Sequence, residues 1–144
     1  MSEVLDMTMY GEAVGKQRPK FNTMTGRAYT PAKTANFEST LAMSAQAYLV
    51  ANNKKPLQGP FNAFVQITKA VPASWSNKKK KLALEGLILP TGKPDIDNVA
   101  KAVLDSLNGV WFSDDSHCTQ LVVGKKYGEE SYYRVMVFEV KHEN

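Results

Sequence analysis

Apolar and polar side chains alternate in four short segments of the chain, a pattern that predicts β-strands. The segments cover residues 4–10, 61–70, 117–127 and 132–141, and the alternation is clearest in the second of them. The last segment is apolar on both of its faces between residues 135 and 138. Such a strand lies in the centre of its sheet or has one face against a second subunit.

Apolar positions at helical spacing predict two long helices. The first covers residues 34–50, with Thr34 as a candidate N-cap. The second covers residues 97–107, from Asp97 in the N-cap position to the helix stop at Asn108-Gly109. One side of the second helix is apolar, and the other side carries Asp97, Asn98, Lys101 and Asp105.

The segments between these elements predict smaller features. Residues 22–32 contain Gly and Pro punctuation and are typical of a turn or a short hairpin. Residues 72–86 predict a short helix capped by Ser74 or Ser76, unless its lysines lie in a loop and the helix begins later. The apolar residues Leu87–Pro90 are expected to pack into the core or to form an edge strand.

The element order is therefore strand, helix, strand, short helix, helix, strand, strand. This order predicts an α+β protein, in which helices cover a mixed β-sheet. The chain has 144 residues, of which 43% are hydrophobic, so residues 1–144 are expected to form one domain with a single core.

Composition narrows the class of protein further. The net charge of +4 favours a polyanionic partner. A single cysteine, Cys118, excludes an internal disulfide framework and fits a reducing cytoplasm. No apolar run reaches the roughly 20 residues that cross a bilayer, and the N-terminal residues lack the features of a signal peptide. We therefore expect a cytoplasmic protein without membrane contact.

An acidic stretch stands out in this basic chain, because residues 93–115 contain five aspartates, namely Asp95, Asp97, Asp105, Asp114 and Asp115. Crowded carboxylates repel each other unless a cation neutralises them. The apolar run Val110-Trp111-Phe112 is expected to anchor the last two aspartates to the core and bring one of them back towards the helix. Oxygen ligands of this kind suit Mg²⁺ or Mn²⁺.

This stretch resembles the signature of RusA-type crossover-junction endodeoxyribonucleases, the Holliday-junction resolvases commonly encoded by phages and prophages. The core of the resemblance consists of Lys93-Pro-Asp-Ile-Asp-Asn-Val99, Lys101, Asp105, Leu107-Asn108-Gly109 and Asp114-Asp115. A weaker resemblance extends upstream, through Lys16–Lys20, Tyr29–Pro31 and Ser74–Ser76.

The resemblance implies roles for individual residues. Asp95, Asp97 and Asp115 match the catalytic carboxylates that bind Mg²⁺, with Mn²⁺ as a possible substitute. Lys101 matches the catalytic lysine. Two further acidic positions have supporting roles, Asp114 as an additional metal ligand and Asp105 beside the lysine.

The resemblance also implies partners. The substrate would be branched DNA in the form of a four-way junction, cut by paired symmetric nicks, and the enzyme would be a homodimer in the bacterial host cell. Basic segments suit contacts to DNA phosphates. The candidate DNA-binding residues are Lys16, Arg18, Lys20, Lys78, Lys79 and Lys125.

Simpler interpretations of the same residues remain open. Asp97 alone is typical of an N-cap, Lys101 with Asp105 of a surface ion pair, and Asp114-Asp115 of a turn. Two alternative functions follow from them. The chain could be a non-catalytic protein that binds DNA junctions through a structural acidic cluster, or another Mg²⁺ enzyme such as a nucleotide phosphatase. Leu87–Pro90 could instead act as an apolar wedge between base pairs.

Overall fold

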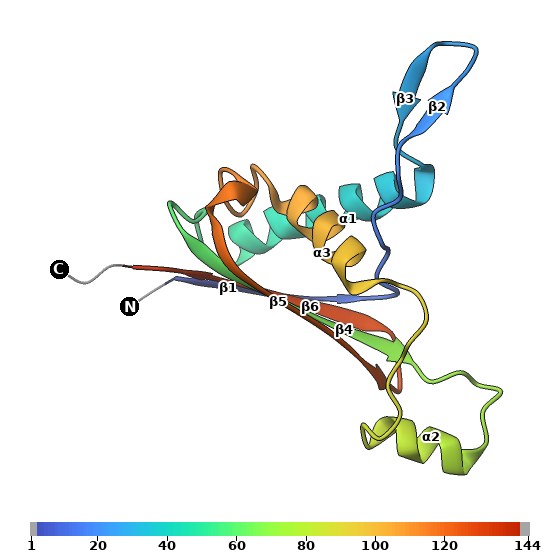
Figure 1. The fold of residues 1–144 in the computed structure, drawn as a ribbon. Coiled ribbons are helices and arrows are strands. Elements are labelled where there is room, and N and C mark those ends of the chain that lie inside the picture. Colours follow the sequence, from blue (N-terminus) through green and yellow to red (C-terminus); the bar gives the residue numbers. More distant parts are fainter. Residues whose placement is uncertain (1–2, 142–144) are drawn as a thin grey trace.

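The centre of the protein is a mixed β-sheet (Figure 1). The structure is a computed structural model, and it describes residues 3–141. The strands of this sheet in that range are β1 (Val4–Tyr10), β4 (Phe61–Ala70), β5 (Cys118–Gly128) and β6 (Tyr132–Glu139). They lie in the order β1-β6-β4-β5, in which β4 and β5 are parallel and the other neighbours are antiparallel. The predicted strands are confirmed, and the doubly apolar β6 lies in the interior of the sheet.

Two long helices cover one face of the sheet, and two smaller elements project from the body (Figure 1). The long helices are α1 (Ala32–Ala51) and α3 (Ile96–Leu107). The strands β2 (Lys20–Asn22) and β3 (Arg27–Tyr29) form an antiparallel hairpin at one end. The helix α2 (Asn77–Leu84) lies at the opposite end. The predicted α+β class and the short hairpin are confirmed.

The parallel pairing of β4 and β5 explains the path of the chain between them. Parallel neighbours require a crossover connection, because the chain must return to the same end of the sheet. Here α2 and α3 make that return, and α3 lies back against the sheet with its apolar stripe buried. Val99, Val103 and Leu107 from this stripe are fully buried in the core.

Trp111 holds the end of α3 and the segment after it in place. Its ring is fully buried, and its Nε1 donates a hydrogen bond to the carbonyl oxygen of Ala45 in α1 at 3.0 Å. The ring also lies 5.3 Å from that of Tyr48, and the next residue, Phe112, stacks on Phe61 of β4 at 4.3 Å. The expected apolar anchor ahead of the last two aspartates is thus confirmed.

Two predicted N-caps are wrong. Helix α1 begins after Pro31, whose fixed φ suits the start of a helix, and Thr34 lies inside it. Thr34 is buried, and Gln17 satisfies its hydroxyl there. The hydroxyl donates to the side-chain oxygen of Gln17 at 3.2 Å and accepts from the backbone N–H of Gln17 at 3.3 Å. Helix α3 has Asp95 as its N-cap, so Asp97 lies within the first turn.

The segment after α2 also differs from expectation. Ser76 caps α2 by accepting a hydrogen bond from the backbone N–H of Lys79 at 3.2 Å, as one of the two predicted alternatives. Leu87–Pro90, however, forms no strand, and its two leucines lie outside the core, since Leu87 is 71% exposed and Leu89 is 58% exposed, whereas Pro90 is buried. The reason is that α2 lies away from the sheet (Figure 1), so these leucines have no core to join.

Among the residues that the structure describes, no helix has both the length and the apolar character needed to cross a bilayer.

Replacement of Trp111 tests the anchor. We expect Trp111→Ala to lower the free energy of unfolding by about 3–5 kcal/mol, since it leaves a large cavity in the core and removes a buried hydrogen bond. Urea denaturation measures this loss. Trp75→Ala is the matched control, because Trp75 is only partly buried beside α2 and its loss should cost clearly less. Equal losses in the two variants would contradict the assigned role.

Candidate active site

Two hollows lie beside helix α3, and they divide the predicted site residues between them. The first has a volume of about 490 Å³ and runs between α3 and β5. We call it the acidic hollow, and its lining residues are Ile96, Asp97, Ala100, Lys101, Leu104, Asp105, Asp115, Leu121 and Val123. Three of the five aspartates and the predicted catalytic lysine therefore share one concave surface.

Helical spacing explains why three of these side chains project together. Asp97, Lys101 and Asp105 follow one another at intervals of four residues, so they lie in a row along one side of α3. The opposite side buries the apolar stripe and fixes the rotation of the helix. Asn98, which was expected in the same row, faces the N-terminal segment instead, where its Cβ would lie 3.1 Å from a Cβ built on Gly15.

Asp115 joins this row from a different part of the chain. It begins the short 3₁₀ turn η1 (Asp115–His117), which follows the Trp111 anchor and leads into β5. Asp114 caps this turn and is bound to Ser116, whose hydroxyl donates to Oδ2 at 2.9 Å. The turn leaves Asp115 in the acidic hollow and Asp114 exposed beside it.

The electrostatics of the acidic hollow reflect its crowded carboxylates. Burial raises the pKa of the Asp115 carboxyl above its usual range, and the neighbouring Asp114 and Asp105 carboxylates raise it further. The ammonium group of Lys101 acts in the opposite direction on the same pKa. The pKa of Asp114 is lowered, chiefly by its hydrogen bond from the Ser116 hydroxyl. A cation bound beside Asp115 would oppose this rise and favour its ionised form.

A cation fits this donor set only in part. Within residues 3–141, no group of three or more His, Cys, Asp or Glu side chains is close enough to hold a metal ion. Asp97 and Asp105 are eight residues apart, about 12 Å along a helix axis, which explains why they do not converge. Mg²⁺, however, binds through one or two carboxylates and keeps its other positions for water and phosphate. Asp97 and Asp115 are chemically suited to such an open site.

Asp95 lies in the second hollow, which we call the basic hollow. This hollow has a volume of about 460 Å³ and lies between the N-terminal segment, the start of α1 and the end of β4. Asp95 accepts a weak hydrogen bond from the Asn98 side chain at 3.4 Å. Five basic residues line the same hollow, namely Lys16, Arg18, Lys33, Lys69 and Lys93. The structure therefore separates Asp95 from the hollow that holds Asp97 and Asp115.

Lysines from the sheet hold the turn that precedes Asp95. Lys125 of β5 donates to the carbonyl oxygens of Gly92 and Pro94, at 2.6 and 3.1 Å. Lys69 of β4 donates to the carbonyl oxygen of Lys93 at 2.9 Å. Lys125 was predicted to contact DNA, but in the structure its ammonium group is engaged with the protein backbone and positions the start of α3.

Lys16 is also engaged within the protein. Its Nζ lies 2.5 Å from Oε1 of Glu38 in α1 and 3.3 Å from Oδ2 of Asp105 in α3. Both partners raise the pKa of Lys16, the Glu38 hydrogen bond most strongly. Its backbone N–H donates to the carbonyl oxygen of Asn98 at 2.9 Å. Lys16 therefore ties the N-terminal segment to both long helices.

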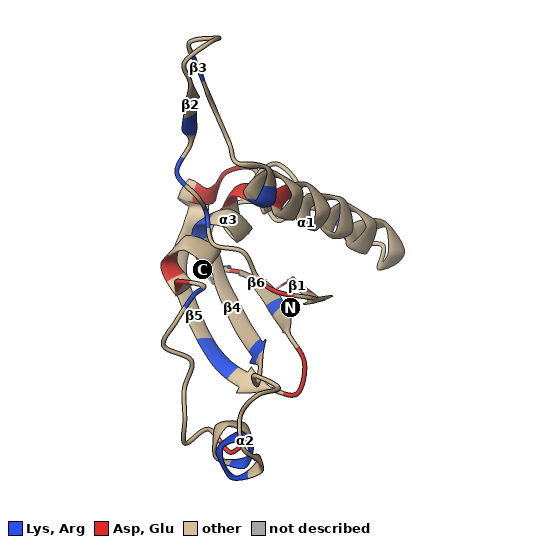
Figure 2. Cartoon of the chain, turned by 90° about the vertical axis from the view of Figure 1, so that its right-hand side faces the viewer, with Lys and Arg blue, Asp and Glu red and all other residues tan. Residues whose placement is uncertain are grey.

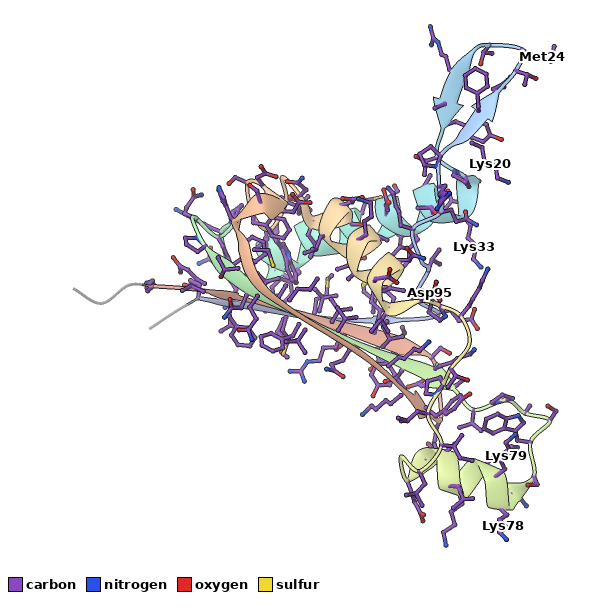
Figure 3. All side chains as sticks on the ribbon, in the orientation of Figure 1. Lys20, Met24, Lys33, Lys78, Lys79 and Asp95 are labelled. Atoms are coloured by element: carbon purple, nitrogen blue, oxygen red, sulfur yellow. The ribbon has the colours of Figure 1, made fainter. Side chains whose placement is uncertain are left out.

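The remaining candidate DNA-binding residues project from the two ends of the molecule. Arg18 and Lys20 lie before and in the hairpin, whereas Lys78 and Lys79 lie in the first turn of α2. Lys79 places its Nζ 3.9 Å from the centre of the Trp75 ring. In Figure 3 the labelled lysines and Asp95 lie on the same side of the molecule. Figure 2 faces that side, with the hairpin and α2 at opposite ends.

Sequence patterns did not indicate several residues of these hollows. Glu38 gave no signal, because its partner Lys16 is 22 positions away in the sequence. Lys69 ends an alternating strand and resembles any solvent-exposed terminal residue. One feature could have indicated Lys33 as a binding residue. It lies in the first turn of α1, where a cation opposes the helix dipole.

Comparisons with known proteins cover nearly the whole chain. The model of a protein family described as endodeoxyribonuclease RusA matches residues 11–138. The chain is also similar to the uncharacterized protein YqaN of Bacillus subtilis (strain 168). The two are 38% identical over 145 residues, which cover 96% of this chain and 98% of the relative. The residues that line both hollows all fall inside the range of the family match.

Asparagine substitutions at the two adjacent aspartates should shift stability in opposite directions in metal-free protein. The pKa of Asp115 is raised on folding, so its contribution to stability falls as the pH rises above the unfolded value. Asp115→Asn should therefore raise Tm at neutral pH and have no effect in acid. The pKa of Asp114 is lowered, so Asp114→Asn should lower Tm at neutral pH, and this loss should vanish as the pH falls through that pKa.

Thermal unfolding followed by circular dichroism in EDTA, between about pH 3 and pH 7.5, measures both shifts. Shifts of the same sign at neutral pH would contradict the assigned electrostatics.

Proposed function

The chain belongs to the RusA family of endodeoxyribonucleases, and on that premise we propose that it resolves four-way DNA junctions by paired, Mg²⁺-dependent nicks. The observation that carries the proposal is the acidic hollow. It gathers Asp97, Lys101 and Asp115 from two separate segments onto one concave surface, inside the range of the family match.

We assign the chemistry to residues of this hollow. Asp97 and Asp115 would hold the metal, and Asp95 and Asp114, which are close to them in the sequence, are the further candidate ligands. Bound Mg²⁺ would supply an activated water and stabilise charge on the scissile phosphate. Lys101 lies one helical turn from Asp97, so its ammonium group can donate to a phosphate oxygen placed over the hollow. Asp105 would hold Lys101 and Lys16 in position by its charge.

The DNA would lie along the side of the molecule shown in Figure 2. The basic hairpin and the lysine-rich α2 are at its two ends, and acidic positions of the chain lie between them. Lysine and arginine on projecting elements suit phosphate contacts that carry no sequence information. Symmetric nicks in a junction require two active sites, so the working form would be a homodimer in the cytoplasm of the host bacterium.

One observation favours the alternative of a non-catalytic junction-binding protein. The described residues 3–141 contain no ready-made cluster of three metal-ligating side chains. A protein of that kind would bind junctions equally well in EDTA and would cut none of them with any divalent cation.

Cleavage of a synthetic four-way junction tests the proposal. With Mg²⁺, the wild type should introduce paired symmetric nicks in the junction and leave a linear duplex of the same sequence intact. Asp97→Asn should bind the junction with unchanged affinity and lose cleavage by about 100-fold or more, since a metal ligand is removed. Glu130→Gln, in the turn before β6, is the matched control and should cut normally.

Other outcomes have distinct meanings. Equal cutting of the junction and the duplex would indicate a general nuclease. Tight junction binding by the wild type without any cutting would contradict the proposed enzyme and favour the binding protein.

Substitutions at two lysines should distinguish a cation that stabilises the fold from a cation that contacts DNA. Lys16→Gln leaves Glu38 and Asp105 without their partly buried partner, so it should lower the free energy of unfolding by about 1–2 kcal/mol. Lys78→Gln should not lower stability, because a cation in the first turn of α2 opposes the helix dipole, and it should reduce the slope of log K against log salt for DNA binding by about 1. Thermal melts and salt-dependent binding titrations measure the two effects. An unchanged salt slope in Lys78→Gln would remove α2 from the DNA-binding surface.

A further inference from the structure

The hairpin formed by β2 and β3 has no packing role within the protein. Every residue of its two strands is exposed, and the hairpin projects from the body beside the start of α1 (Figure 1). A two-stranded hairpin of this length is marginally stable in water by itself. Its apolar residues are nevertheless outward, with Phe21 64% exposed and Met24 at the tip 95% exposed.

The hairpin has a defined shape and a fixed base. Asn22 orders the tip, because its side-chain oxygen accepts from the backbone N–H groups of Met24 and Thr25 at 2.9 and 3.2 Å. At the base, Gln17 and the buried Thr34 exchange hydrogen bonds, and the backbone of Lys16 is bound to that of Asn98 in α3. The hairpin is therefore attached directly to the helix that carries Asp97.

Strand alternation divides the hairpin into two chemical faces. Phe21 pairs with Ala28, and this pair forms an apolar face. The other face carries Lys20 opposite Tyr29, and Asn22 opposite Arg27. One face can thus meet apolar or aromatic groups while the other meets anions.

The charge of this segment identifies its partner as a polyanion. Residues 17–37 contain four cations, Arg18, Lys20, Arg27 and Lys33, and no carboxylate. In Figure 3, Lys20 of the hairpin and Lys33 lie on the same side as Asp95, and the tip residue Met24 lies beyond them. A protein partner would need a matching acidic surface, whereas nucleic acid offers phosphates and bases together.

We propose that the β2–β3 hairpin recognises the branch point of the DNA, with Phe21 and Met24 against unstacked bases and Lys20 and Arg27 on the flanking phosphates. Phe and Met are among the apolar side chains that enter between base steps and unstack them. This inference rests on the proposed function, and it makes the hairpin the element that distinguishes a branched from a linear substrate. It also offers an alternative to Leu87–Pro90 as the candidate wedge, because the hairpin tip is ordered by Asn22 and its base is bound to α1 and α3.

The first experiment uses a four-way junction with 2-aminopurine at the branch point, in EDTA so that no cleavage occurs. The wild type should raise the fluorescence of the probe by unstacking it. The double variant Phe21→Ser/Met24→Ser should abolish that rise and weaken junction binding about tenfold, with duplex binding unchanged. Met43→Ser is the matched control, because Met43 is 71% exposed on α1 and should behave as the wild type.

The second experiment tests the basic face. The double variant Lys20→Gln/Arg27→Gln should reduce the slope of log K against log salt by about 1.8 on duplex DNA, the value for two lost phosphate contacts. The substituted side chains are exposed, so both double variants should melt at the wild-type temperature.

Three results would overturn the inference. In the first, Phe21→Ser/Met24→Ser unstacks and binds the junction as the wild type does, which leaves the proposed function intact. In the second, a Leu87→Ser/Leu89→Ser variant loses the rise in 2-aminopurine fluorescence, and the hairpin variant keeps it. In the third, sedimentation shows that the hairpin variant converts a dimer to a monomer, which would make the hairpin a subunit contact. A wild type without any preference for the junction would overturn the inference and the proposed function together.

Discussion

The burial of one side of α3 is the interaction on which the rest of the site depends. Val99, Val103 and Leu107 are fully buried against the sheet and α1, and this sets the rotation of the helix. Because the helix has 3.6 residues per turn, the same rotation places Asp97, Lys101 and Asp105 together on the other side. The row of Asp97, Lys101 and Asp105 is thus a direct consequence of core packing, and a change in that packing would turn the row away from Asp115.

Two further constraints bring the other site residues to α3. The Trp111 anchor fixes the chain after the helix, so that the turn at Asp115 closes the acidic hollow. Lys69 and Lys125 hold the turn before the helix through its backbone carbonyls. Both lysines come from the strands β4 and β5, whose parallel pairing makes α3 part of the crossover. The sheet therefore covers the core and also holds the turn that leads into the site.

The charges of the chain serve two different purposes that composition cannot distinguish. Lys16 and Lys125 neutralise or bind groups of the protein itself and hold α3 in place. Lysines at the starts of α1 and α2 oppose the helix dipole and gain nothing from their own helices. Their position on the side that faces the viewer in Figure 2 is consistent with a polyanionic partner that compensates them.

The sequence by itself determined the element order, the mixed α+β class and the row of Asp97, Lys101 and Asp105, because these follow from local periodicity. It also indicated the anchoring role of the residues before Asp114, since a run of three large apolar residues must be buried. The local pattern predicted Thr34 and Asp97 as the N-caps of α1 and α3, and both predictions were wrong. Thr34 lies inside α1 and is held by a tertiary hydrogen bond to Gln17, and the turn before α3 makes Asp95 its N-cap.

Only the tertiary structure decided that Asp95 and Asp115 lie in different hollows, that Lys16 binds Glu38, and that Leu87 and Leu89 remain exposed. Each of these outcomes depends on contacts between residues far apart in the chain, which sequence periodicity does not encode.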